Sequence, residues 1–183
     1  MDHGASSYRR YLDGDESAFD EIVKELFDPL VFFIDQYVRD VYAAEDIAID
    51  VFADVVAHPK RYNFKVTLKT YLFMLGKSRA LNYIKHRRSL RESVIDDAYP
   101  LPDGGNTPET LFLQDERSRA VHAALAKLSD DMRLAVHLVF FEQLSYEETA
   151  RVMKKNKKQV DNLLYRAKKE LREMLGEEGR TLL

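Results

Sequence analysis

An acidic segment containing proline and glycine, residues 92–110, divides the helical pattern of this chain in two. Its sequence, ESVIDDAYPLPDGGNTPET, holds three prolines, two glycines and five acidic residues, and it shows no hydrophobic periodicity. That composition is typical of a linker. The stretches on either side are shorter than a common domain of roughly 100–150 residues, so each is predicted to be a small helix bundle. We therefore expect an all-α chain with one domain at 1–91 and another at 111–183, joined by a flexible acidic linker.

Hydrophobic residues recur at helical spacing on both sides of this segment, and no strand pattern is present. Before the segment, the pattern predicts helices over 17–38, 43–57 and 67–88. Ser17 is the expected N-cap of the first helix, and Pro29 is expected to kink or split it.

The pattern after the segment predicts further helices. Apolar residues from Leu111 to Leu128 form one stripe, and Ser129 is the expected cap of the next helix. That helix should bury an apolar stripe that runs from Met132 to Phe140. Two shorter helices are expected to follow.

The composition excludes several kinds of site. The chain of 183 residues contains no cysteine, which excludes a disulfide scaffold and a cysteine nucleophile. Its five histidines share no metal-ligand spacing, and no phosphate-binding glycine motif is present. We expect no enzyme activity, no metal and no cofactor. Because no apolar run approaches the roughly 18 residues of a membrane span, and the first residues do not read as a secretory signal, a cytoplasmic protein is expected.

Charges are arranged in blocks, although the net charge is only −3. Residues 60–91 contain ten basic residues, no acidic ones, and several interleaved aromatics. Basic side chains neutralise phosphates and aromatic rings stack on unpaired bases, so the block favours single-stranded or partly melted DNA. An ordinary solvated helix face is the alternative. Tyr62, Asn63 and Phe64 precede the helix and are expected in an exposed pocket, whereas core and surface positions are equally open for Tyr71.

Near the C-terminus, two short helices separated by a turn are predicted, and the second is rich in Lys, Asn, Gln and Arg. Ser145 and Glu148 have the spacing of a capping box, which Asn156 and Gln159 repeat. This pattern predicts a helix-turn-helix whose second helix enters the major groove, where Lys and Arg suit guanine and Asn suits adenine. A bundle hairpin with a basic rim is the alternative. The outward positions are Lys157, Lys158, Asp161, Asn162, Tyr165, Arg166 and Lys168.

Residues 44–54 form an acidic helix pattern with Glu45, Asp46, Asp50 and Asp54. No histidine accompanies these carboxylates, so a metal or catalytic site is the weaker interpretation. Asp46 and Asp50 are four residues apart and share one helix face. We interpret this face as a docking surface for a basic partner, with a plain solvated face as the next alternative.

The order of acidic helix, basic aromatic helix, acidic linker and helix-turn-helix resembles the bacterial RNA polymerase sigma factors of the sigma-70 family, extracytoplasmic-function (ECF) group. Three stretches carry the resemblance: AEDIAIDVFADVV (44–56), TLKTYLFMLGKSRALNYIKHRR (67–88) and LSYEETARVMKKNKKQVDNLLYRAKKELR (144–172). The resemblance implies a protein that binds core RNA polymerase and directs promoter-specific initiation. It would recognise −10 and −35 elements and open the −10 strands. An anti-sigma factor is a further partner that the resemblance suggests.

The same resemblance implies roles for particular residues. Docking to the clamp helices of the largest polymerase subunit falls to Glu45, Asp46, Asp50 and Phe52, and the polymerase flap is a further implied contact. Capture of flipped −10 bases falls to Arg61, Tyr62, Asn63, Phe64, Lys69, Tyr71, Lys77, Arg79, Asn82 and Lys85. Reading of the −35 element falls to Asn156, Lys157, Lys158, Asp161, Asn162, Tyr165 and Arg166. The acidic linker resembles the segment that threads toward the polymerase active site.

The chain departs from the family pattern at a few positions. Tyr71 stands where the family usually has Trp, and we expect it to keep the packing or stacking role. Lys154 and Lys155 stand where the turn usually has Gly and an apolar residue, which puts the turn geometry in question and adds candidate phosphate contacts. Asp161 replaces a commonly basic residue, so the −35 sequence read here is expected to be unusual.

Two other functions stay open on the sequence. One is a dimeric helix-turn-helix regulator that binds duplex DNA, although it leaves the 60–91 block without a role. The other is a sigma-like decoy that binds polymerase without directing initiation.

Overall fold

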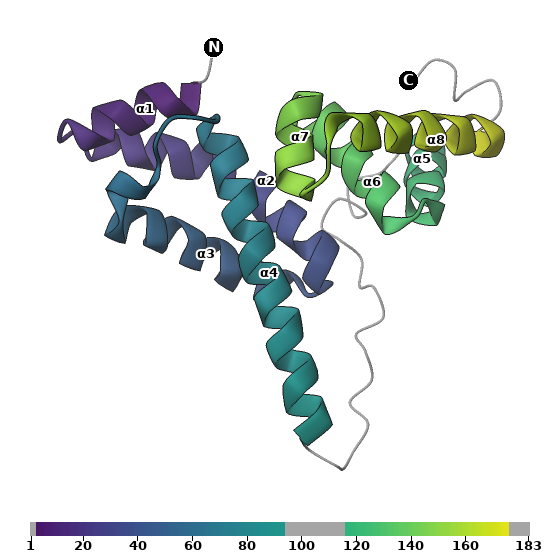
Figure 1. The fold of residues 1–183 in the computed structure, drawn as a ribbon, viewed down its shortest axis with the longest axis horizontal. Coiled ribbons are helices and arrows are strands. Elements are labelled where there is room, and N and C mark those ends of the chain that lie inside the picture. Colours follow the sequence, from purple (N-terminus) through teal and green to yellow (C-terminus); the bar gives the residue numbers. More distant parts are fainter. Residues whose placement is uncertain (1–2, 94–115, 176–183) are drawn as a thin grey trace. The chain divides into compact units, whose positions relative to one another are not determined.

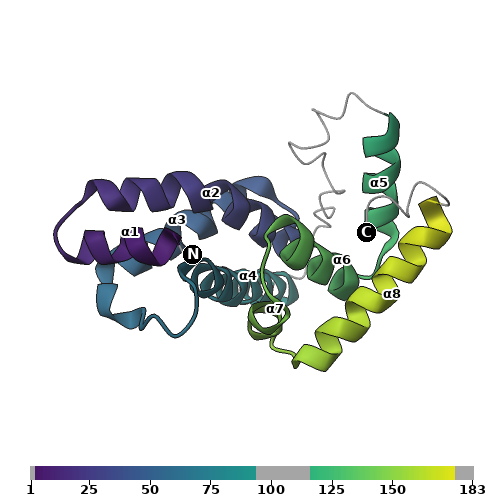
Figure 2. The same cartoon turned by 90° about the horizontal axis from the view of Figure 1, so that it is seen from above.

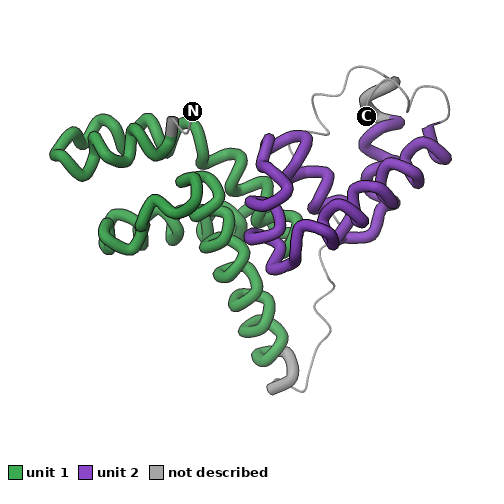
Figure 3. Tube along the Cα trace, turned by 45° about the horizontal axis from the view of Figure 1, so that its top comes forward, with its two compact units in different colours: residues 1–105 green, residues 106–183 purple. Residues whose placement is uncertain are grey.

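The computed structural model describes residues 3–93 and 116–175, which belong to two compact units with a boundary between Gly105 and Asn106 (Figure 3). Within those described ranges every regular element is helical, in agreement with the predicted fold class. Most of the predicted linker, residues 94–110, lies outside the described residues, as does the start of the helix predicted from Leu111. No helix in the described ranges is long and apolar enough to cross a membrane.

The first unit consists of α1 (His3–Leu12), α2 (Ser17–Val38), α3 (Val41–Ala57), the short 3-10 helix η1 (Pro59–Arg61) and α4 (Leu68–Ser93) (Figure 1). Helix α2 packs against α1, α3 and α4. The core between these helices is filled by large apolar side chains. Those without exposure include Leu30, Phe33, Ile34, Val51, Leu68 and Phe73. The C-terminal part of α4 continues past the other helices, and most of its side chains after Ala80 are exposed.

Helix α2 is continuous through Pro29, so of the two predicted effects, a kink or a split, the split is wrong. A proline inside a helix removes one hydrogen bond and costs about 3 kcal/mol. Here Leu26, Leu30 and Phe33 on both sides of the proline are buried in the core. Burial of each such side chain contributes about 1.5–3 kcal/mol, which offsets the loss.

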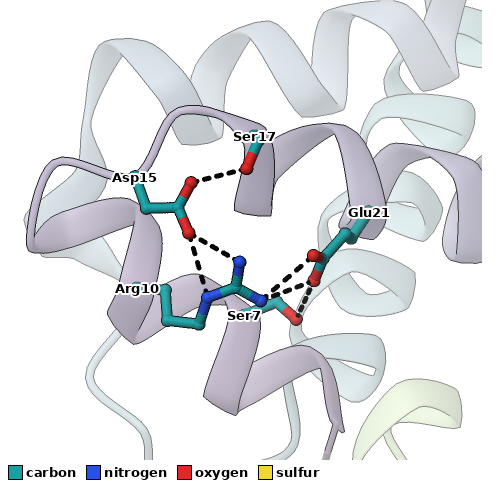
Figure 4. A network of polar contacts seen from close by, with 5 residues as sticks. All are labelled: Ser7, Arg10, Asp15, Ser17 and Glu21. Atoms are coloured by element: carbon teal, nitrogen blue, oxygen red, sulfur yellow. Dashed lines mark hydrogen bonds and ion pairs between the residues drawn. The ribbon is translucent and has the colours of Figure 1, made fainter.

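The predicted cap of α2 is also wrong. The helix has no side-chain capping bond, and the Ser17 hydroxyl donates instead to Asp15 Oδ1 at 2.6 Å (Figure 4). Helix α3 begins two residues before the predicted start, because Asp40 caps it by accepting a hydrogen bond from Ala43 N at 3.2 Å. These differences lie at helix ends, where the hydrophobic periodicity carries little information.

The N-terminal helix α1 was not predicted. Its Tyr8 has no exposed surface, and the phenol hydroxyl donates to the Pro59 carbonyl at 3.0 Å. Tyr8, Tyr11 and Leu12 do have helical spacing, but the segment is short and polar. The helix depends on burying Tyr8 against residues about fifty positions away, which a local pattern cannot reveal.

The second unit consists of α5 (Glu116–Lys127), α6 (Asp130–Val136), the π-helix η3 (His137–Phe141), α7 (Tyr146–Met153) and α8 (Lys157–Leu175). Helix α8 packs against α5, α6 and α7 (Figure 2). The core is formed by Leu128, Met132, Ala135, Leu138, Val152, Val160, Leu164 and Leu171.

One predicted core position in this unit is exposed. The sequence pattern puts Phe140 on the apolar stripe, but the residue is 38% exposed, and the Lys168 ammonium lies 5.0 Å from the centroid of its ring. The cause is the π-turn, in which Glu142 N donates to His137 O at 3.0 Å. The wider turn shifts the helical register, so the stripe that begins at Met132 does not extend to Phe140.

Candidate nucleic-acid interface

Helices α7 and α8 both begin with the predicted capping boxes, which are confirmed. Ser145 Oγ accepts from Glu148 N at 3.3 Å, and the Glu148 carboxylate accepts from Ser145 N at 3.0 Å. Asn156 Oδ1 accepts from Gln159 N at 2.8 Å, and Gln159 Oε1 accepts from Asn156 N at 2.8 Å. Each box satisfies backbone N–H groups that a helix start leaves unpaired, so local sequence fixes where both helices begin.

The turn between these helices forms without glycine. Lys154 adopts the left-handed conformation with φ 56°, and its N–H donates to the carbonyls of Ala150 and Arg151. A non-glycine residue in this conformation costs about 1–2 kcal/mol. The Lys155 ammonium lies 3.0 Å from the Asp131 carboxylate of α6 and so ties the turn to the bundle. The turn that the sequence left in question is therefore intact, and of its two lysines Lys154 is the exposed one.

Helix α8 presents one polar face. Its apolar side, including Val160 and Leu164, is buried. Tyr165 is 72% exposed, whereas Lys157 forms a long ion pair with Glu147 at 3.4 Å, which is weak because both side chains are largely exposed. All seven predicted −35 positions are exposed. Asn156 precedes α8, and the other six lie on the outward face of the helix: Lys157, Lys158, Asp161, Asn162, Tyr165 and Arg166.

On the first unit, the loop before α4 is held by an aromatic cluster. Tyr62 is only 3% exposed, so the expectation that it lines an exposed pocket is wrong. Its ring lies 4.6 Å from Phe64, 5.2 Å from Tyr71 and 5.3 Å from Tyr8, measured between centroids. Its hydroxyl donates to Val66 O at 2.7 Å. Tyr62 therefore anchors the loop from inside because it fills the space between α1 and α4.

Asn63 and Phe64 keep the exposure that the prediction requires, since Asn63 is exposed and Phe64 is half-buried. Phe64 has a positive φ of 60°, and Asn63 Oδ1 accepts from Lys65 N at 3.1 Å, which stabilises this tight turn. Arg9 of α1 lies over the Phe64 ring, with Cζ 5.0 Å from the centroid. The loop thus presents one aromatic ring and one amide beside a cation.

Asp54 organises the start of the basic surface. Its Oδ1 lies 3.0 Å from Arg61 Nη1, 3.6 Å from Arg79 Nη2 and 3.1 Å from His58 Nδ1. Asp54 is largely buried, with a side-chain exposure of 16%, and it holds two predicted DNA-binding arginines at one point. Tyr71 lies nearby and is half-buried; burial, followed by the negative charge of Asp54, raises its pKa. The sequence pattern grouped Asp54 with the acidic docking face, and its pairing with these arginines was missed.

The remaining predicted positions of α4 vary in exposure. Lys69 and Lys77 are half-buried, and the Lys69 ammonium lies 5.9 Å from the centroid of the Phe73 ring. Asn82 and Lys85 are exposed on the part of α4 that continues past the bundle.

Helix α3 presents three of its four acidic residues outward. Glu45, Asp46 and Asp50 are exposed, but Phe52 is 6% exposed and packs against Phe19 and Phe27. A direct contact from Phe52 to a partner does not fit this burial, because the ring belongs to the core of the unit.

Two apolar residues on the same face were missed. Tyr42 is 78% exposed and Ile49 is 54% exposed, and they share the helical spacing of the acidic residues. Large exposed apolar side chains beside charges are typical of protein interfaces. The sequence signal for these two residues is their helical spacing from the acidic residues, which puts large apolar side chains at outward positions.

Comparison with known proteins finds similarity to bacterial sigma factors. A family model described as Sigma-70, region 4, matches residues 118–171, which include α6, α7 and most of α8. The RNA polymerase sigma-H factor of Pseudomonas aeruginosa is 28% identical over 163 residues, covering 85% of this chain and 84% of that protein. The ECF RNA polymerase sigma factor SigX of Bacillus subtilis is 25% identical over 170 residues, covering 89% and 88%. The chain is therefore similar, over most of its length, to sigma factors that include ECF members of the sigma-70 family.

Two solved structures share the fold of this chain. The sigma factor RpoE from Bartonella quintana, solved in complex with the anti-sigma factor NepR, has a TM-score of 0.62 at 23% identity, and the match covers 87% of this chain and 97% of that one. CnrH, solved in complex with the cytosolic domain of CnrY, has a TM-score of 0.60 at 18% identity, with 94% of each chain covered. The resemblance predicted from the sequence is confirmed, and the sigma factors that the chain resembles are transcription regulators, not enzymes.

Proposed function

We propose that this chain is an ECF sigma factor that binds core RNA polymerase and directs initiation at promoters that it recognises through two DNA elements. The observation that carries the proposal is the presence of two basic, exposed surfaces, each backed by a buried apolar side, on two separate units of one chain. A protein that reads two spaced promoter elements requires this arrangement. The proposal also implies that the protein acts in the cytoplasm, where polymerase acts.

Helix α8 is the proposed reader of the −35 element. Its exposed face offers Lys158 and Arg166 for guanine edges or phosphates, and Asn162 for adenine. The Asp161 carboxylate on the same face accepts hydrogen bonds but donates none, which suits the amino group of cytosine. Its negative charge repels a misplaced phosphate. The capping boxes and the Lys155–Asp131 ion pair support this role because they define where α8 begins and join the turn to α6.

The loop with Asn63 and Phe64, together with the basic face of α4, is the proposed −10 site. A flipped base can stack on an exposed ring, and each such contact contributes about 1–3 kcal/mol. That gain offsets the few kcal/mol needed to unstack one base. Tyr62 and Asp54 support the site from behind: one anchors the loop, and the other holds Arg61 and Arg79.

The exposed face of α3 is the proposed docking surface for the polymerase clamp. Glu45, Asp46 and Asp50 supply charge complementary to a basic partner, and Tyr42 and Ile49 supply apolar contact area. The polymerase flap is the proposed contact for the second unit. An anti-sigma factor is a further proposed partner, since RpoE of Bartonella quintana was solved with one.

The proposal is tested by pull-down with purified bacterial core polymerase, followed by run-off transcription from genomic fragments. We expect binding and discrete transcripts that depend on the protein. Binding without transcripts favours the decoy, and an absence of binding favours the duplex-binding regulator.

A charge reversal tests the docking surface in the same assay. We expect Asp50→Lys to weaken polymerase binding by about tenfold or more, which corresponds to about 1.4 kcal/mol. Glu25→Lys, at an exposed position of α2, is the matched control and should bind like the unchanged protein. Equal losses in both variants would mean that only net charge matters and that α3 is not the docking face.

A further inference from the structure

Helix α1 carries two adjacent arginines whose surroundings differ sharply. Arg10 is held by two carboxylates: its Nη2 lies 2.6 Å from Asp15 Oδ2, and its Nη1 lies 3.0 Å from Glu21 Oε2 (Figure 4). The hydrogen bonds that Arg10 donates, the one to Asp15 first and the one to Glu21 next, raise the pKa of Arg10. The network joins α1 to the start of α2, so the charge of Arg10 is matched inside the protein.

Arg9 has no such partner among the described residues. No carboxylate within those ranges lies at ion-pair distance from its guanidinium, and the side chain is exposed. It contacts the Phe64 ring instead, 5.0 Å from Cζ to the centroid. A guanidinium over an aromatic ring gains cation–π energy while its N–H groups stay available to a phosphate. The position is therefore that of an unmatched cation beside the loop.

The position of Arg9 is fixed relative to this loop by its neighbour. Tyr8 is fully buried, donates to the Pro59 carbonyl and packs edge-on against Tyr62, 5.3 Å between centroids. Its ring also lies 6.2 Å from Phe64. Because Tyr8 ties α1 to both η1 and the loop, the backbone at Arg9 cannot move away from the loop without breaking core contacts.

We propose that Arg9 binds a backbone phosphate of the melted −10 strand, next to the base held by Phe64. The inference rests on the proposed function. It adds Arg9, from the mostly acidic residues 1–59, to the DNA-binding residues of the basic block 60–91. A base that stacks at Phe64 carries its own phosphates to the rim of the loop, where the exposed cations Lys60, Lys65 and Arg9 lie. Arg9 is the one of these that contacts the ring. Its planar donor fork suits bidentate phosphate binding.

The test uses holoenzyme reconstituted from core polymerase and the full chain. The probe is a fluorescent single-stranded oligonucleotide with the non-template −10 sequence of a promoter found by the run-off assay. Affinity is measured across a series of potassium chloride concentrations for the unchanged protein, Arg9→Gln, Arg9→Lys and Arg10→Gln.

We expect Arg9→Gln to lower affinity about five- to tenfold and to reduce the slope of log K against log salt by about 0.7, the value for one phosphate contact with a single strand. Arg9→Lys should keep the slope. Arg10→Gln should also keep the slope, although it should lower the melting temperature because it breaks the network of Figure 4.

An unchanged slope for Arg9→Gln, even with weaker binding, overturns the inference, because Arg9 would then only position Phe64. If the unchanged protein gives transcripts and Arg9→Gln binds normally, the inference fails while the proposed function stands. If the unchanged protein gives no transcripts with core polymerase, the proposed function fails, and the phosphate contact fails with it. Thermal melting of Arg9→Gln separates misfolding from lost contact, since an exposed residue should leave the melt unchanged.

Discussion

The buried Tyr8 hydroxyl is expected to make the stability of the fold fall at alkaline pH. Tyr8 has no exposed surface, and burial, followed by the charges of Tyr11 and Tyr71 when ionised, raises its pKa to about 12. Tyr8→Phe keeps the ring and its aromatic contacts but removes the hydrogen bond to Pro59 O. At neutral pH this loss should cost about 1 kcal/mol of unfolding free energy.

The cost of Tyr8→Phe should shrink and then reverse as the pH rises. In the unfolded chain Tyr8 ionises near pH 10, whereas in the folded chain it holds its proton to about pH 12. The folded state therefore binds more protons between these values, so stability is complete below about pH 10 and falls by about 1.4 kcal/mol per pH unit above it. The Tyr8→Phe variant has no phenol at this position and so has no such loss. The two proteins should reach equal stability at roughly pH 10.7, where the accumulated loss matches the value of the hydrogen bond.

Urea unfolding followed by far-UV circular dichroism, repeated from pH 7 to pH 11, measures this difference. Tyr165→Phe is the matched control because that phenol is 72% exposed on α8, and it should show no difference at any pH. A Tyr8→Phe cost that stays constant between pH 8 and pH 11 would refute the reasoning, since the buried phenol would then not be linked to folding.

Further predictions concern the second unit. Glu148→Ala removes one half of the first capping box and should cost about 1 kcal/mol of unfolding free energy, read from the shift in urea midpoint; Glu147→Ala, one residue earlier and outside the box, should cost less. Asn162→Ala should cost about 1–3 kcal/mol of promoter binding and relax the preference at one −35 base pair, as measured by binding to single-base promoter variants. Lys158→Ala should instead weaken binding to all of those variants alike and lower the slope of log K against log salt by about 0.9. A uniform loss for Asn162→Ala, or a loss at one base pair only for Lys158→Ala, would contradict the roles assigned to these residues of α8.

The sequence predicted well those features that depend on neighbouring residues. Both capping boxes of the helix-turn-helix are formed as expected, because each requires only two side chains three residues apart. The exposed face of α8 follows from the spacing of Val160, Leu164 and Ala167, which fixes which side of the helix is buried. The family resemblance also rested on such local stretches.

Features that join distant segments were missed. Tyr62 reads as a loop aromatic, yet it is buried because α1, which the local pattern did not predict, lies against it. Asp54 reads as one more acid on α3, yet it pairs with Arg61 and Arg79 from two other elements. Each outcome depends on which helices pack together, and the periodicity of a single helix does not contain that information.

The sequence by itself determined most of the helical elements, though not α1, as well as the division into two stretches and the polar face of the second helix of the helix-turn-helix. These follow from backbone capping and from the period of 3.6 residues, which act within a few residues. Only the tertiary structure decided that Tyr8 and Tyr62 are core residues and that Arg10 is paired with carboxylates while Arg9 lies over an aromatic ring. The reason is physical: burial and charge pairing are set by distances in space, and folding brings residues about fifty positions apart into contact.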